Sequence, residues 1–420
     1  MQMSGNSLNK EKIRIMAPAG SFESLHAALQ GGAGAVYFGV DRLNMRSRSA
    51  GNFSLDDIGS VSEICRKNDV SSCLTINTLL YDDDMPSMRE LVAEAKKQHI
   101  SALIVSDISA IEYARKMDME VHLSTQLNIG NGEAVKFFSQ FADVMVLARE
   151  LSLEQLARIR DIIEADNITG PSGRKVQLEV FVHGAMCMAI SGKCYLSLHE
   201  TGHSANRGAC LQICRRAYTV KEKESGRELD IENEFIMSPR DLCTIHFLNK
   251  IIDAGATVLK IEGRARSPEY VNTVTRCYSE ALESILSSNY TAARIGEWRE
   301  KLETVFNRGF WDGYYLGQRL GEWSHIYGSR ATRKKIYAGK ATNYYSRIGV
   351  AEFLIENGSL REGEEVLITG PGTGVIQLIP AEIRNDNGQT KEVFKGENCA
   401  FKVDREVRRS DKLYRLTERK

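Results

Sequence analysis

The sequence lacks an excess of charge of either sign, because 55 lysines and arginines are matched by 55 aspartates and glutamates. Without a global field, any nucleic-acid site has to be a local basic patch. Long apolar runs are also missing, since no stretch approaches the roughly 20 residues needed to span a bilayer. The opening segment MQMSGNSLNKEK has no apolar core of the kind found in export signals. These absences predict a soluble, cytoplasmic protein that does not bind membranes.

Cysteine is unevenly distributed along the chain. Five of the nine cysteines are scattered, as expected for a residue that is usually a small buried hydrophobe. The other four are Cys187, Cys194, Cys210 and Cys214, separated by six, fifteen and three residues. Glycines lie between and beside them, so the segment resembles a loop wrapped around a centre.

Three interpretations of this cluster compete. Disulfides are disfavoured by the odd number of cysteines and by the reducing compartment that the N-terminal segment indicates. Structural zinc suits the short gap between Cys210 and Cys214, but the gap between Cys187 and Cys194 exceeds the usual two to four residues. Four thiolates at irregular spacing suit a cubane iron–sulfur cluster, which we favour, with zinc and packing or redox thiols as alternatives.

Strand-like and helix-like segments alternate over most of the chain. Short β-rich runs occupy residues 13–17, 35–39, 72–76, 102–105, 121–124, 144–148, 176–182 and 258–261. Amphipathic stretches between them include residues 21–30, 56–68, 88–98 and 153–163, and Ser152 with Gln155 forms a capping box before the last of these. Eight β units alternating with helices predict an α/β fold, a TIM-like (β/α)8 barrel rather than an open sheet.

Polar residues follow most of these strands, and barrel active sites are built at the carboxyl ends of the strands. The polar positions are Asn77, Asp107, Gln126, Asn128, Arg149, Glu150, His183, Glu262 and Arg264. The cysteine segment follows the seventh strand directly, and we expect a helix to resume near residues 238–241. An insertion of this length at the catalytic face predicts a functional lid over the barrel mouth.

The texture of the chain changes near its end. Glycine-rich turns separate short alternating strands after Tyr337, which predicts a small C-terminal β-barrel. The predicted organisation is an N-terminal tail (1–12), a catalytic barrel (13–325) with a cluster-binding insertion (184–237), a basic linker (326–336) and a β module (337–420). Candidate phosphate contacts are Arg330, Arg333, Lys334, Lys335, Arg405, Arg408 and Arg409. The alternative for each of these patches is a solvated face.

The segment from His199 to His203 matches the H-E-x-x-H pattern of zinc proteases. That chemistry requires a helix that turns both imidazoles toward one metal. Gly202 interrupts the segment, and no apolar periodicity supports a helix through it. We therefore interpret the match as coincidental.

Several segments resemble one known family. They are EVFVHGAMCMAISGKCYLS (179–197), RGACLQICR (207–215), MAPAG (16–20), VLARELS (146–152) and LKIEGR (259–264). Together they closely resemble the signature of the collagenase-like peptidase family U32. The resemblance extends over residues 13–320, and the C-terminal β module also resembles that of one branch of the family.

The resemblance implies an enzyme, although the family name implies proteolysis and its better understood members resemble oxygen-independent hydroxylases. One branch hydroxylates the wobble uridine of tRNA with prephenate as hydroxyl donor, another acts on ribosomal RNA, and a third acts on a quinone ring. The length and the β module resemble the tRNA branch. In these relatives a 4Fe–4S cluster is held by four cysteines, which match Cys187, Cys194, Cys210 and Cys214 here.

Roles for the other candidates follow from their chemistry. We expect Arg46, Arg149 and Arg264 to clamp the carboxylates of a small anionic co-substrate such as prephenate. The amides of Asn77, Gln126 and Asn128 suit the edge of a base. Glu150 belongs to the same predicted substrate site, and Glu262 or His183 is the candidate for proton transfer. The expected function is hydroxylation of a tRNA uridine; peptidase activity, or hydroxylation of another RNA or of a quinone, is the alternative.

Overall fold

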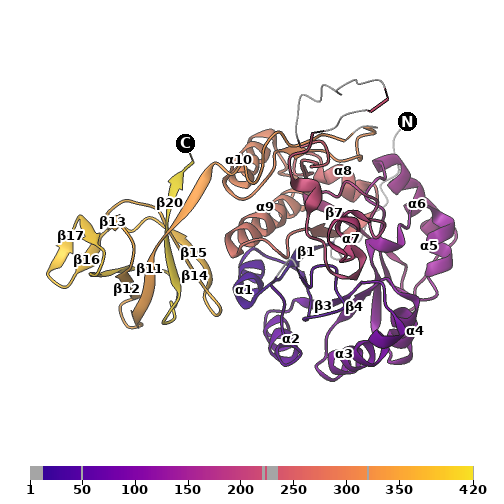
Figure 1. Ribbon diagram of the computed structural model, residues 1–420, viewed down its shortest axis with the longest axis horizontal. Helices are drawn as coiled ribbons and strands as arrows, with labels where there is room; N and C mark the ends of the chain where they lie inside the picture. The colour runs from indigo at the N-terminus through magenta and orange to yellow at the C-terminus, as the bar shows by residue number, and fades with distance from the viewer. Residues whose placement is uncertain (1–12, 49–50, 220–222, 225–234, 319–320, 420) are drawn as a thin grey trace.

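The computed structural model describes residues 13–48, 51–219, 223–224, 235–318 and 321–419. The N-terminal tail predicted for residues 1–12 lies outside the described residues. The rest of the chain forms a barrel of parallel strands surrounded by helices and, beside it, a smaller antiparallel sheet (Figure 1).

Eight parallel strands close the barrel. They are β1 (Arg14–Pro18), β2 (Ala35–Phe38), β3 (Ser71–Ile76), β4 (Ala102–Val105), β5 (Glu120–Leu123), β6 (Val144–Val146), β7 (Gln177–Ala185) and β9 (Ala256–Ile261). Each pairs with the next in this order, and β9 pairs with both β7 and β1. The predicted TIM-like (β/α)8 fold is confirmed, with all eight strands at the expected positions.

Two short strands extend the sheet beyond the closed barrel. Strand β8 (Asp241–Cys243) pairs antiparallel with the end of β7, and β10 (Phe310–Trp311) pairs with β8. The expectation that a helix resumes near residues 238–241 is wrong, because this segment continues the sheet and α8 begins only at Leu248.

Helices cover the outside of the barrel. They are α1 (Phe22–Gln30), α2 (Asp57–Lys67), α3 (Met85–Lys97), α4 (Ile108–Lys116), α5 (Gly132–Phe138), α6 (Leu153–Ala165), α8 (Leu248–Asp253), α9 (Pro268–Leu286) and α10 (Ala292–Thr304). The capping box predicted at Ser152 is present at the start of α6. The main apolar core lies between the strands and these helices. A smaller apolar cluster, which includes Met16, Ala102 and Val258, comes from side chains on the opposite face of the strands, inside the barrel.

The C-terminal sheet is antiparallel. Its strands are β11 (Arg333–Tyr345), β12 (Val350–Ile355), β14 (Val366–Gly370), β15 (Gly374–Leu378), β16 (Ile383–Asn385), β17 (Gly388–Thr390), β19 (Asn398–Lys402) and β20 (Lys412–Glu418), while β13 (Ser359–Arg361) pairs with β18 (Glu392–Phe394). Strand β11 begins inside residues 326–336, the stretch suggested as a linker. The module has its own apolar core, around Phe353 and Phe401.

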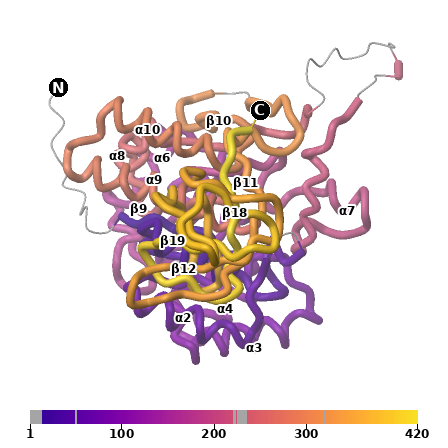
Figure 2. The backbone as a smooth tube through the Cα atoms, turned by 90° about the vertical axis from the view of Figure 1, so that its left-hand side faces the viewer, coloured from indigo at the N-terminus to yellow at the C-terminus, as the bar shows by residue number. Residues whose placement is uncertain are grey.

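The C-terminal sheet packs on the barrel through β15 and α1. The amide of Gln30, the last residue of α1, donates to the carbonyl of Thr373 (2.8 Å) and accepts from the backbone N–H of Val375 (3.0 Å). Figure 2 shows the sheet in yellow in front of the barrel, and the segment that carries α7 (Leu196–Thr201) projecting to one side. No helix within the described ranges is long and apolar enough to cross a membrane.

Candidate functional site

A cavity of about 120 Å³ opens at the carboxyl ends of the barrel strands, where the sequence places the site. Its lining includes six residues expected from sequence and two of the clustered cysteines: Arg46, Asn77, Gln126, Arg149, Glu262, Arg264, Cys187 and Cys210. Four cationic side chains line it, those of Arg46, Arg149, Lys260 and Arg264, against one carboxylate, that of Glu262. The cavity therefore favours an anionic ligand.

Arg46 and Glu262 form an ion pair at the cavity, with 3.0 Å between Nη2 and Oε1. Burial alone would raise the pKa of Glu262, but the charges of Arg46, Arg266 and Arg149 outweigh it and lower that pKa below its usual range. Glu262 is thus held as a carboxylate at neutral pH, a state suited to accepting a proton.

Arg149 has donors to spare. Its guanidinium stacks on the ring of Phe181 at 3.9 Å and donates from Nη1 to the carbonyl of Ala185 (3.1 Å). Its Nε is buried and has no hydrogen-bond partner in the structure. A buried N–H without a partner costs free energy. Because Arg149 lines the cavity, its guanidinium can also donate to a carboxylate or carbonyl oxygen that enters there.

Arg264 is more firmly fixed in the fold. It donates to Oγ1 of Thr75 (3.0 Å) and to Oδ1 of Asn44 (2.9 Å), and burial lowers its pKa. A Cβ at Gly39 would lie 2.2 Å from its Nη1, so the barrel wall needs glycine there. Arg264 therefore contributes charge to the cavity from a nearly buried position.

The amides of Asn77 and Gln126 form a connected group in the cavity wall. Asn77 accepts from the backbone N–H of Met45 (3.2 Å) and donates to Ser124 (3.2 Å), whose hydroxyl also bonds Gln126. Asn128 does not line the cavity. From a left-handed backbone conformation (φ 52°) it donates to the carbonyl of Ser191 (3.1 Å) and so ties the cysteine segment to the barrel.

A buried charge network lies beneath the cavity. Lys260, on β9, forms an ion pair with Glu179 on β7 and lies 4.6 Å from the ring centroid of Tyr37. His122, on β5, faces the other oxygen of Glu179 at 3.5 Å. Burial alone would raise the pKa of Glu179, but Lys260 and His122 lower it to about 2.

The structure does not bring His183 and Glu150 to the cavity. A bulge in β7 shifts the register between Phe181 and His183, so that Phe181 faces the cavity while His183 packs against Tyr278 of α9 and Phe310 of β10. Burial lowers the pKa of His183 to about 3, which keeps its imidazole neutral. Glu150 is exposed at the end of its strand.

The four clustered cysteines are not joined by disulfides, and Cys187 and Cys210 line the cavity at the barrel mouth. Burial raises the pKa of Cys214; Arg215 opposes this, and the charges of Cys187, Cys210 and Cys194 raise it further. The four thiols are close enough to interact electrostatically, and thiolates are the ligands that hold an iron–sulfur cluster. Among the described residues, however, no three potential ligands are already arranged to hold a metal ion.

The H-E-x-x-H segment does not form a metal site. Helix α7 ends at Thr201, and Gly202 takes a left-handed conformation (φ 69°). His203 lies beyond the helix, with Nδ1 2.7 Å from the carbonyl of Thr201. The two imidazoles are therefore not presented by one helical face.

The predicted phosphate contacts of the C-terminal region are partly neutralised. Arg333 pairs with Glu365 at 2.7 Å, Lys335 with Glu269 at 2.8 Å, and Arg405 lies 3.9 Å from Asp404. Lys334 and Arg409 are exposed. The other two predicted contacts, Arg330 and Arg408, lie beside Gly309 and Gly372.

Sequence reasoning missed several residues of the site, chiefly Tyr37, Ser124, Phe181 and Lys260. One signal was present. Lys260, Glu179 and His122 each lie between two apolar residues of a buried strand. A charge in a buried strand has to find a partner inside the barrel. In the sequence, Tyr37 and Phe181 cannot be distinguished from ordinary core residues of a strand.

Comparison with known proteins identifies the family. The model of peptidase family U32 matches residues 20–325. A Porphyromonas gingivalis protein named collagenase is 59% identical over 98% of this chain and 100% of its own length. The Bacillus subtilis tRNA hydroxylation protein P1 is 29% identical over 96% of this chain and 95% of its own. The Escherichia coli 23S rRNA 5-hydroxycytidine C2501 synthase is 33% identical over 75% of this chain but only 47% of its own.

Proposed function

We propose that this chain, which belongs to peptidase family U32, hydroxylates a pyrimidine base in RNA, with a tRNA uridine as the expected target. The observation that carries the proposal is the cavity, in which four cationic side chains face one carboxylate and a wall of amides. Relatives named for hydroxylation of tRNA and of 23S ribosomal RNA match most of the chain. The higher identity to a protein named collagenase makes peptidase activity the second candidate.

The cavity suits this chemistry better than it suits proteolysis. A serine or cysteine protease needs its nucleophile beside a base. The buried hydroxyl of Ser124 instead bonds amides, those of Asn77 and Gln126. No histidine lines the cavity, as far as the described residues show.

Each wall then has a part in the reaction. Arg149 and Arg46, which both line the cavity, bind the carboxylates of a prephenate-like donor. The amides of Asn77 and Gln126 hold the polar edge of the base. Glu262, kept ionised by the surrounding arginines, accepts the proton released from the base.

The donor supplies the hydroxyl group and accepts the two electrons that the base loses. The C–H bond of the base is replaced by C–OH, so the base loses two electrons. The donor, an alcohol, exchanges its C–O bond for C–H and takes up those two electrons, so molecular oxygen is not needed.

We further propose that Cys187, Cys194, Cys210 and Cys214 hold a 4Fe–4S cluster. Such a cluster would supply electron transfer when bound. Its support is the sequence resemblance and the position of Cys187 and Cys210 in the cavity wall.

The test is a reaction with defined components. Protein purified without oxygen is analysed for iron and acid-labile sulfide, then incubated with tRNA and prephenate, and the nucleosides are analysed by mass spectrometry. We expect about four irons and four sulfides per chain and a product heavier by one oxygen atom. Arg149→Ala should lose the product, whereas Arg158→Ala, on the exposed face of α6, should retain it.

Stoichiometric zinc without acid-labile sulfide would contradict the proposed iron–sulfur cluster. Cleavage of gelatin together with unmodified nucleosides would favour the peptidase alternative. Product on ribosomal RNA alone, or on a quinone, would retain the hydroxylase and change its substrate.

A further inference from the structure

A second hollow lies beside the cavity, and its lining is strongly basic. It encloses about 580 Å³, and among the residues that the structure describes its wall contains five arginines and no carboxylate. We name it the arginine groove, defined by Arg48, Arg215, Arg216, Arg266 and Arg308 together with Phe306 and Tyr327. None of these arginines belongs to the basic patches recognised from sequence.

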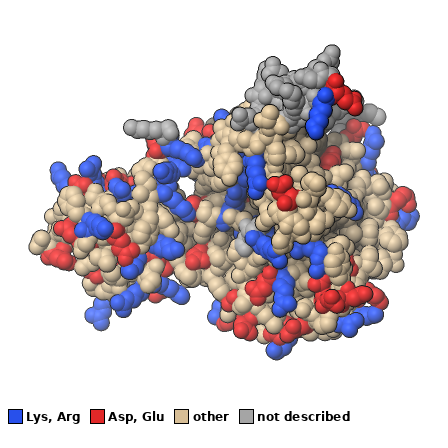
Figure 3. All heavy atoms as spheres, viewed as in Figure 1, with Lys and Arg blue, Asp and Glu red and all other residues tan. Residues whose placement is uncertain are grey.

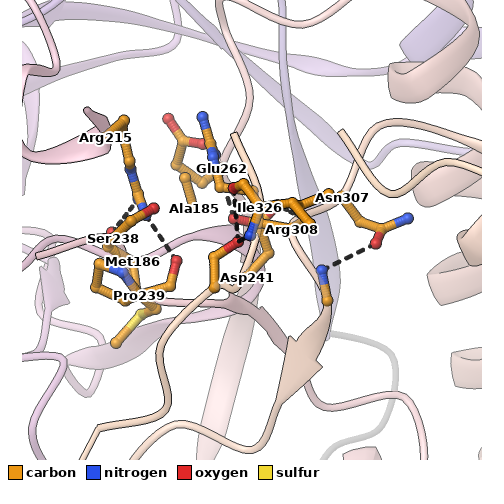
Figure 4. Close-up of polar contacts among 12 residues, drawn as sticks. Ala185, Met186, Arg215, Ser238, Pro239, Asp241, Glu262, Asn307, Arg308 and Ile326 are labelled. Carbon is orange, nitrogen blue, oxygen red and sulfur yellow. Dashed lines mark hydrogen bonds and ion pairs between the residues drawn. The ribbon is translucent and has the colours of Figure 1, made fainter. Parts of the chain in front are cut away.

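The fold holds two of these guanidinium groups rigidly. Arg215 donates to Oγ of Ser238 (3.1 Å) and to the carbonyls of Pro239 and Met186 (2.6 Å each), as Figure 4 shows. Arg308 is held beside Asp241, with 3.4 Å between Nη1 and Oδ1.

Aromatic rings complete the groove. The Arg266 guanidinium stacks on the ring of Phe306 at 3.6 Å, and that of Arg308 lies 5.0 Å from the same centroid. Tyr327 is 75% exposed, an unusual position for a large aromatic side chain. Guanidinium groups beside exposed aromatic rings are typical of surfaces that bind single-stranded nucleic acid.

The positive charge of the groove is only partly balanced. Burial lowers the pKa of Arg308 to about 10; Asp241 opposes this, while Arg215 and Arg266 add to it. Arg216 lies 3.7 Å from the carboxylate of Glu200. Figure 3 shows lysine and arginine side chains (blue) gathered over the middle of one face of the molecule, between the C-terminal sheet and the barrel.

The groove adjoins the cavity. Cys210 lines both. A smaller hollow of about 380 Å³ shares Arg264 with the cavity and shares Arg48 and Arg266 with the groove. A chain bound along the arginines would therefore pass directly beside the site where a base enters.

We propose that the arginine groove binds the sugar–phosphate backbone of an RNA strand next to the base that enters the cavity, and that Tyr327 stacks on a neighbouring base. This proposal rests on the proposed function. It assigns RNA binding to the barrel face and its cysteine insertion rather than to the C-terminal sheet.

The test measures RNA binding alone, without donor. A fluorescent tRNA anticodon stem-loop is titrated with full-length protein at several salt concentrations, using wild type, Arg48→Ala/Arg216→Ala, Tyr327→Ala and Arg158→Ala. Arg48 and Arg216 are both exposed, so the double variant should keep the melting temperature of wild type. Arg158, also exposed, is the matched control.

We expect the double variant to raise the dissociation constant roughly tenfold to a hundredfold and to reduce the slope of log affinity against log salt by about 1.4, two phosphate contacts on a single strand. Tyr327→Ala should weaken binding about tenfold. The control should match wild type.

Equal affinity of the double variant and the control would overturn the proposal. So would equally effective competition by uridine monophosphate, which would indicate a small-anion site, or by polyglutamate, which would indicate an acidic peptide. RNA binding that depends on the groove, without any hydroxylated product, would support the arginine groove as an RNA-binding site and reject the proposed hydroxylase function. If the double variant hydroxylates RNA as fast as wild type, the groove is rejected as an RNA-binding site and the proposed function is retained.

Discussion

Four cationic side chains and one carboxylate meet in a space of about 120 Å³ at the barrel mouth. The ion pair between Arg46 and Glu262 joins residues 216 positions apart. No local pattern in the sequence contains such a pair, because only closure of the barrel brings the two strand ends together. Arg149, Glu262 and Arg264 were predictable from their positions after strands, but Lys260 and the partners of these side chains were not.

Arg46→Ala should lower the free energy of unfolding by about 2–3 kcal/mol at neutral pH, because it leaves a mostly buried carboxylate without its counter-charge. The pKa of Glu262 lies below its ordinary value of 4.5 in the folded protein. Its contribution is therefore complete above that value and is lost as the pH falls through the lower folded-state pKa. In Arg46→Ala that pKa rises, so the loss begins at higher pH.

Urea unfolding at several pH values checks this prediction. Glu262→Gln serves as control, since it removes the titrating group and with it this part of the pH dependence. An unchanged pH profile in Arg46→Ala would contradict the assignment.

Lys260→Met should be more damaging, by about 3–5 kcal/mol, since Glu179 is fully buried and would lose its main counter-charge. The double variant Lys260→Met/Glu179→Gln should recover much of that loss, because the uncompensated charge is gone. Thermal or urea unfolding of both variants measures the coupling. Strictly additive losses would show that the two side chains act independently.

At the scale of elements, local pattern predicted the strands well and the insertion poorly. The barrel strands are apolar runs bounded by turns, so their positions follow from sequence. Strand β8 has only three residues, one of them the aspartate that holds Arg308, and carries no periodic signal. The bulge in β7 reverses the facing of His183, which simple alternation along the strand places in the cavity.

The length of helix α7 determines whether His199 and His203 can bind one metal ion. Because α7 ends before His203, His199→Ala and His203→Ala should each leave the hydroxylation rate within about twofold of wild type, as expected for surface positions. Cys210→Ala, in the cavity wall, should abolish it. Nucleoside analysis of in vitro reactions distinguishes the variants. A large loss in both histidine variants, reversed by added zinc, would revive the metalloprotease interpretation.

At the scale of the whole molecule, the C-terminal sheet is attached to the barrel through apolar packing and several polar contacts, among them the ion pair between Lys335 and Glu269. Gln30 bonds both Thr373 and Val375, and Leu367 and Val375 belong to the barrel's main core cluster. The β texture of this region was evident from its turns. Its docking surface was not, because the contact spans more than 340 positions.

Gln30→Ala should weaken this docking by about 1–3 kcal/mol, since it leaves the N–H of Val375 buried without an acceptor. Hydrogen exchange measured by mass spectrometry should show faster exchange in β15 and unchanged exchange in β4, on the barrel. Gln98→Ala, at the end of α3, is a control that leaves this interface intact. Unchanged protection of β15 would show that the hydrogen bonds of Gln30 do not hold the sheet on the barrel.

The most direct test of the central claim is nucleoside mass spectrometry of RNA from the source organism with the gene deleted, then complemented with wild type or with Arg149→Ala. We predict that deletion leaves one pyrimidine nucleoside lighter by an oxygen atom, that wild type restores it, and that Arg149→Ala does not. Identical nucleosides in all strains would contradict the account and return the peptidase alternative to first place.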